Sequence, residues 1–125
     1  MRGRAAWARK LGVGETRGSK MGNRWTVVDG EKFQSKKEAE RFAWLKMVER
    51  AGKITEVKRQ VRFKLQIGET HLTGFVADFT YTDPERGFVI EDVKGRRDSR
   101  DPTYQLWRLK ARLMSALLGH TVTEI

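Results

Sequence analysis

Residues 73–94 read TGFVADFTYTDPERGFVIEDVK, and this stretch decides the fold. Apolar side chains occupy alternate positions up to Tyr81, which predicts a strand over about residues 73–81. The Asp-Pro and Gly residues of segment 83–87 are typical of a turn, and residues 88–94 are rich in strand-forming side chains. The stretch therefore predicts a β-hairpin.

Two acids in this hairpin are placed symmetrically about Glu85. Asp78 lies seven residues before Glu85, and Asp92 lies seven residues after it. If Glu85 is the centre of the turn, the two acids are directly opposed, with Cβ atoms about 4.5–5.5 Å apart. Lys94 lies two residues beyond Asp92 and shares its face. A slip of one residue in the register would place the acids on opposite faces.

Two opposed carboxylates repel each other, and a divalent cation removes that repulsion. Mg²⁺ binds oxygen ligands and commonly uses one or two carboxylates together with substrate phosphate. We therefore expect Asp78 and Asp92 to bind Mg²⁺ or Mn²⁺, and Lys94 to position or activate an attacking water. The alternative is a solvated hairpin face on which Lys94 is only a cross-strand ion-pair partner.

The 125-residue chain is strongly basic, with 26 Lys and Arg against 16 Asp and Glu and a net charge of +10. Such a surplus indicates a polyanionic partner, most often a nucleic acid. The chain contains no Cys, which excludes disulfides, zinc–thiolate sites and thiol nucleophiles. Apolar runs are only a few residues long, so we expect no membrane span.

Composition divides the chain into two parts. Residues 1–22 contain five Gly and six Lys or Arg, with Glu15 as the single acid. This composition predicts a basic, flexible arm that lies along phosphates. Residues 23–125 are expected to form one domain.

Segments outside the central hairpin have clear local signals. Residues 25–33 predict a second hairpin, because they contain an Asp-Gly pair that suits a tight turn with positive φ. A helix is expected from about 36 to 51, with Ser35 as its N-cap and Glu38 in the position of a capping box. Alternating apolar side chains predict a strand over residues 57–67.

The C-terminal part predicts a helix and a short strand. The helix begins at Pro102 or Thr103 and continues to Leu118, and residues 121–125 form the strand. The side chains expected to face the inside of the protein from this helix are Leu106, Trp107, Leu109, Leu113, Met114 and Leu117. This order of elements predicts a mixed α/β domain.

Asp78 followed by Asp92-Val93-Lys94 resembles the PD-(D/E)xK nuclease signature, in which an acid on one strand meets an acid-x-Lys on the next. Ala77 replaces the proline that often precedes the first acid. A wider set of residues resembles a family of small phage and prophage proteins related to endonuclease I-type and archaeal-type Holliday junction resolvases. The resemblance extends over about residues 21–125. The residues that carry it are segments 30–39, 52–54, 77–79 and 91–95, together with Gln60.

The resemblance implies a restriction-endonuclease-like core, with a mixed β-sheet flanked by two main helices. It implies a Mg-dependent endodeoxyribonuclease that acts on branched DNA, such as a Holliday junction, as a homodimer in the cytoplasm of a bacterial host. Glu38 would complete the metal site, with Glu40 as the alternative, and Val93 would contribute its backbone carbonyl. A capping box explains Glu38 without a metal. Gln60 would be a neighbour of the site or an ordinary solvated residue.

Several cations are candidates for contacts with nucleic acid. Arg96, Arg97 and Arg100 follow Lys94 closely and are expected to contact phosphates. Lys110 matches a basic residue of the family and is a further candidate. Two other functions stay open, namely a nicking or other structure-specific nuclease and a nucleic-acid-binding protein without catalysis.

Overall fold

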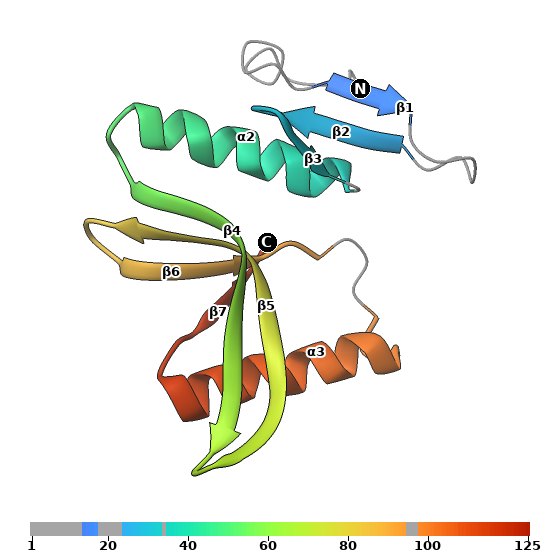
Figure 1. The fold of residues 1–125 in the computed structure, drawn as a ribbon, viewed down its shortest axis with the longest axis vertical. Helices are drawn as coiled ribbons and strands as arrows, with labels where there is room; N and C mark the ends of the chain where they lie inside the picture. The colour runs from blue at the N-terminus through green and yellow to red at the C-terminus, as the bar shows by residue number, and fades with distance from the viewer. Residues whose placement is uncertain (1–13, 18–23, 34, 95–97) are drawn as a thin grey trace. The chain divides into compact units, whose positions relative to one another are not determined.

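The computed structural model describes residues 14–17, 24–33, 35–94 and 98–125 (Figure 1). The chain divides into two compact units, Met1–Ile54 and Thr55–Ile125. The sequence predicts one domain over residues 23–125, and this boundary stays a prediction.

The N-terminal unit contains a three-stranded antiparallel sheet in the order β1 (Gly14–Arg17), β2 (Arg24–Val28) and β3 (Glu31–Phe33). The Asp-Gly turn between β2 and β3 has φ angles of 49° and 80°, as the sequence predicts for a tight hairpin turn. Strand β1 lies within the segment predicted as a flexible arm, yet it pairs with β2 along its length. The rest of that segment lies outside the described residues.

Helix α2 (Lys36–Arg50) follows the small sheet and confirms the predicted helix. The side chain of Ser35 accepts a hydrogen bond from the backbone N–H of Glu38, 3.2 Å away, which satisfies one of the free donors of the first turn. The apolar side of α2 is buried through Ala39, Phe42, Ala43 and Leu45. The helix ends before Gly52, whose φ of +79° favours glycine.

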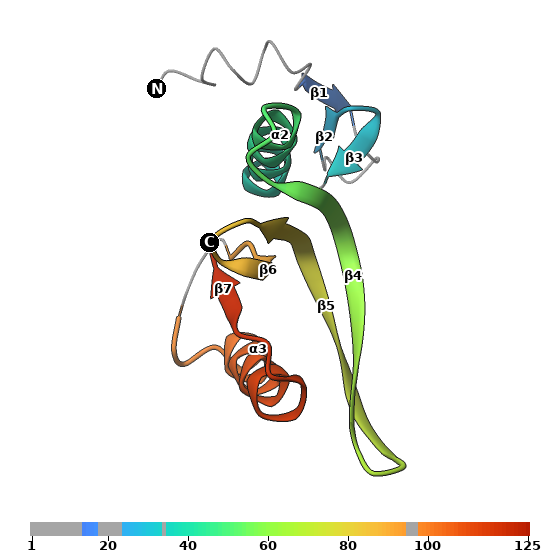
Figure 2. The same ribbon diagram turned by 90° about the vertical axis from the view of Figure 1, so that its left-hand side faces the viewer.

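The C-terminal unit contains a mixed four-stranded sheet in the order β4 (Thr55–Ile67), β5 (Thr70–Asp83), β6 (Gly87–Asp92) and β7 (Val122–Glu124). The first three strands are antiparallel, and β7 is parallel to β6. Figure 2 shows the β4–β5 hairpin extending well past the short strands β6 and β7. The predicted α/β class is confirmed.

The crossover from β6 to β7 is made by helix α3 (Pro102–Leu113), which continues into a π-helical segment η1 (Met114–Leu118). The core of the unit contains Leu65, Phe75, Ala77, Ile90 and Met114, with Phe63, Trp107, Leu113, Leu117 and Val122 packed against it. No helix among the described residues has the length and the apolar composition that a membrane span needs.

The prediction that Leu106 and Leu109 face the inside is wrong. Their side chains are 52% and 51% exposed. Trp107 and Met114 lie seven residues apart on the stripe that meets the core. Since a helix turns about 100° per residue, Leu106 and Leu109 point about 100° and 160° away from that stripe.

Candidate active site

Strands β5 and β6 pair in the register that the sequence predicts. Phe79 is opposite Glu91, and Asp83 is opposite Gly87, so Glu85 is the centre of the turn. In this register Asp78 and Asp92 are the next opposed residues.

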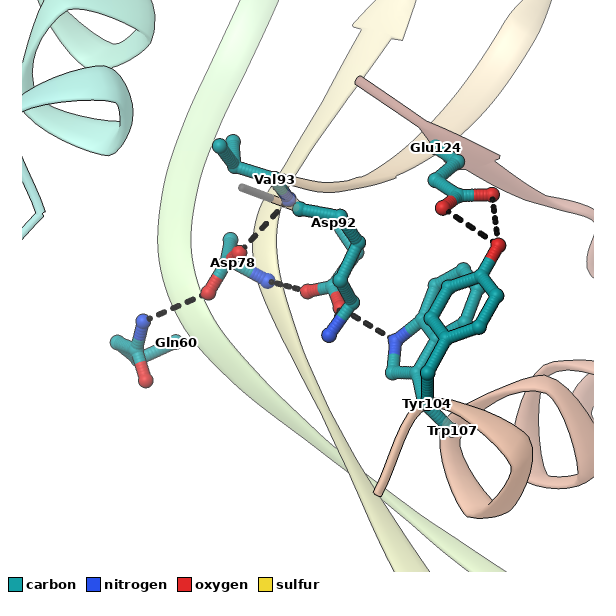
Figure 3. Close-up of polar contacts among 8 residues, drawn as sticks. Gln60, Asp78, Asp92, Val93, Tyr104, Trp107 and Glu124 are labelled. Carbon is teal, nitrogen blue, oxygen red and sulfur yellow. Dashed lines mark hydrogen bonds and ion pairs between the residues drawn. The ribbon is translucent and has the colours of Figure 1, made fainter. Parts of the chain in front are cut away.

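The structure brings Asp78 and Asp92 side by side, as Figure 3 shows. The backbone N–H of Asp78 donates to Oδ1 of Asp92 over 3.0 Å. The backbone N–H of Val93 donates to Oδ2 of Asp78 over 2.8 Å. Each carboxylate is therefore held by the backbone of the opposite segment, which fixes the two acids relative to each other.

Lys94 places its ammonium at the same site. Its Nζ lies 3.1 Å from Oδ2 of Asp92 and 4.7 Å from the ring centre of Trp107. Its backbone N–H donates to the carbonyl of Ile125 over 3.2 Å. Asp92 is only 3% exposed, and burial of a carboxylate is costly unless it is paired and hydrogen-bonded. Lys94 offsets part of that cost.

Trp107 is a further residue of the site, which the sequence assigns only to the core. Its indole Nε1–H donates to Oδ2 of Asp92 over 2.5 Å. Tyr104 stacks on the indole at a centroid distance of 5.8 Å, and its hydroxyl donates to Oε2 of Glu124 over 2.9 Å. Glu124 is opposite Asp92 in the parallel β6–β7 pair. Helix α3 therefore contacts the Asp92 carboxylate through Trp107, and β7 holds the neighbouring Tyr104 through Glu124.

Gln60 lies beside Asp78, where the family resemblance suggests a neighbour of the site. Its Nε2 donates to Oδ1 of Asp78 over 3.3 Å. The backbone of Gln60 has a φ of +53° within β4, which is unusual for a residue with a side chain. This conformation costs about 1–2 kcal/mol and is found preferentially at functional sites.

The carboxylate pair fits a hard divalent cation by the chemistry of its oxygen atoms. Among the residues that the structure describes, no group of three or more His, Cys, Asp and Glu side chains is arranged to hold a metal ion. Asp78 and Asp92 therefore offer two carboxylate ligands. Mg²⁺ keeps several waters and is usually bound through one or two carboxylates plus substrate phosphates, so two are sufficient.

The predicted helix acids lie in the N-terminal unit. Glu38 and Glu40 are both on α2 and half-buried, and the backbone of Glu38 has the capping contact with Ser35. The contribution of either acid to a metal site stays a prediction. So does the role of the Val93 carbonyl, since the contact with Asp78 is made by the N–H of Val93.

The predicted contacts with nucleic acid are only partly within the described residues. Arg96 and Arg97 lie outside them. Arg100 is exposed, with its Nε 3.5 Å from Oδ1 of Asp98. Lys110 is half-buried on α3. Their contacts with DNA stay predictions.

Comparison with known proteins gives a family for this chain. Residues 18–114 match the family model described as "Protein of unknown function (DUF1064)". No curated protein and no solved structure matches the chain. The matched range contains Gln60, Asp78, Asp92, Lys94 and Trp107. The chain therefore belongs to the DUF1064 family of proteins of unknown function.

Proposed function

We propose that the chain is a metal-dependent DNA endonuclease that hydrolyses phosphodiester bonds in branched DNA, with the Holliday junction as its substrate. The observation that carries the proposal is the fixed pair of Asp78 and Asp92, with the Lys94 ammonium 3.1 Å from Asp92. In a basic protein that only binds DNA, two adjacent acids would repel phosphates. A nuclease needs them to hold a cation.

Asp78 and Asp92 would hold Mg²⁺ or Mn²⁺, with the Val93 carbonyl as a further predicted ligand. When bound, the ion neutralises charge on the reacting phosphate and lowers the pKa of water. Lys94 would orient the attacking water or a phosphate oxygen with its ammonium donors. Trp107 and the backbone N–H of Asp78 would hold the Asp92 carboxylate in one orientation.

A relation to the PD-(D/E)xK nucleases is part of the proposal. It is supported by the mixed sheet, in which Asp78 on β5 lies next to an acid-x-Lys segment that begins at Asp92, the last residue of β6. The choice of branched DNA comes from the resemblance to Holliday junction resolvases. Since these enzymes cut two strands symmetrically, we propose a homodimer with two sites.

A specific observation favours a second function, DNA binding without catalysis. Both oxygens of Asp78 and both oxygens of Asp92 accept hydrogen bonds from the protein, and Lys94 forms an ion pair with Asp92. A cluster with a purely structural role would have the same contacts. The two functions differ in whether any DNA is cut.

The test is a cleavage assay with labelled four-way, flapped, single-stranded and linear duplex DNA, in Mg²⁺, in Mn²⁺ and in EDTA. We expect cleavage of the four-way junction with either metal and none in EDTA. Asp78→Asn should lower the cleavage rate by about 10²-fold or more and keep junction binding, whereas Glu85→Gln, an exposed acid in the turn, should cut normally. Cutting by Asp78→Asn at the wild-type rate would contradict the assignment. Failure to cut any DNA with either metal would favour the second function.

A further inference from the structure

We propose that the exposed side of β4 binds the phosphate backbone of DNA next to Asp78. The residues that carry this inference are Lys58, Arg62 and Lys64, called here the β4 cation row. The inference rests on the proposed function for the identity of its ligand. It adds where the DNA backbone lies relative to Asp78 and Asp92.

The alternation of burial along β4 places the β4 cation row on the solvent side. Lys58, Arg62 and Lys64 are exposed, as is Gln60 between them. The intervening residues Val57, Arg59, Val61 and Phe63 are half-buried, and Leu65 is buried. The row is a run of positive charge, since Glu56 is the only acid in the strand.

The β4 cation row flanks the contact that reaches Asp78. Residues two apart in a strand are separated by about 6.6–6.8 Å. Lys58 lies two residues to one side of Gln60, and Arg62 lies two residues to the other. Gln60 in turn donates to Asp78 over 3.3 Å. A backbone that follows β4 would therefore pass the carboxylate pair with cations on both sides of it.

Within the part of the chain that the structure describes, these three cations form no ion pair with an acid. Their partners across the sheet are uncharged, with Thr80 opposite Lys58, Val76 opposite Arg62 and Gly74 opposite Lys64. Other cations of the described residues do have acidic partners, such as Lys46 with Glu49 and Lys94 with Asp92. A row of cations without acidic partners attracts a polyanion.

Protection of a sheet edge is the competing explanation for these cations. Strand β4 is at the edge of its sheet, and charged side chains on edge strands prevent pairing with other chains. Edge protection requires charge and predicts aggregation when it is lost. Phosphate binding predicts instead a defined change in the salt dependence of DNA affinity.

The test measures binding of the full chain to a labelled four-way junction by fluorescence anisotropy, in EDTA, between about 50 and 200 mM salt. The row variant is K58Q/R62Q/K64Q. The matched control is K53Q/R86Q/R112Q, which removes the same charge from exposed positions elsewhere. A charge-retaining variant, K58R/R62K/K64R, checks that the row acts through charge. Circular dichroism checks that each variant folds.

We expect the row variant to lower the slope of log affinity against log salt by about 2–3, since each lost phosphate contact removes about 0.7–0.9. The control variant should lose less than half of that, and the charge-retaining variant should keep the wild-type slope. Equal losses in the row and control variants, or an unchanged slope in the row variant, would overturn the inference. A row variant that aggregates but binds normally would assign the cations to edge protection.

Failure of the inference is distinguishable from failure of the proposed function. Binding in EDTA does not require cleavage. If the wild-type chain cuts the junction with Mg²⁺ and the row variant keeps its slope, the inference alone fails. If no DNA is cut and the row still determines the slope, the nuclease proposal alone fails.

Discussion

The indole Nε1–H of Trp107 donates to Oδ2 of Asp92, while Lys94 lies over the face of the same ring. One aromatic side chain from α3 thus contacts both the acid and the cation of the acid-x-Lys segment. The stack of Tyr104 on Trp107, and the bond from Tyr104 to Glu124, tie this side chain to β7.

Trp107→Phe separates the two contacts, because it keeps a ring for Lys94 and removes the N–H that Asp92 accepts. We expect the free energy of unfolding to fall by about 1.5–3 kcal/mol, the usual contribution of a hydrogen bond to a charged group. Trp44→Phe is the control, since Trp44 is 38% exposed. The measurement is urea unfolding followed by circular dichroism. Equal losses in both variants would show that the bond to Asp92 contributes nothing specific.

Gln60→Gly tests the backbone conformation at the residue that contacts Asp78. With φ at +53°, Gln60 is strained, and glycine adopts this conformation without penalty. We expect the free energy of unfolding to stay constant or to rise by up to about 1 kcal/mol. Gln66→Gly, at an exposed position of the same strand, should instead lower it by about 0.5–1 kcal/mol. A comparable loss at both positions in thermal unfolding would refute the strain at Gln60.

Asp83 contributes to the pH dependence of the β5–β6 turn. Hydrogen bonds from the backbone N–H groups of Glu85 and Arg86 hold the pKa of Asp83 below its usual range. A carboxyl with a lowered pKa stabilises the fold above its unfolded pKa, and the contribution is lost as the pH falls through the folded pKa. Asp83→Asn should therefore lower the Tm at neutral pH, and the difference from wild type should shrink as the pH falls below the ordinary Asp pKa of about 3.9. A difference in Tm that is constant with pH would contradict this account.

Local patterns predicted much of the fold correctly. The symmetry of Asp78 and Asp92 about Glu85 predicted the register, because a short turn leaves few ways to pair two strands. The capping contact between Ser35 and Glu38 also follows from a short stretch of chain.

Contacts between distant elements were not predictable in the same way. Trp107 lies 15 residues from Asp92 in the sequence. Its helical spacing from Met114 is typical of a core position, so the sequence alone does not indicate that Trp107 also has a polar contact. The pairing of β1 with β2 is similar, since the composition of the first residues indicates only their charge and flexibility. Leu106 and Leu109 are exposed because the apolar residues of α3 spread over more of the helix surface than one sheet can cover.

The central claim is that Asp78 and Asp92 together bind a divalent cation, and Mn²⁺ binding measured by electron paramagnetic resonance tests it most directly. We expect the wild-type chain and the Glu85→Gln control to bind Mn²⁺ equally well. Asp78→Asn and Asp92→Asn should each weaken binding by about 10-fold or more, since a carboxylate ligand is lost. Mn²⁺ affinity that is the same in all four proteins would contradict the account.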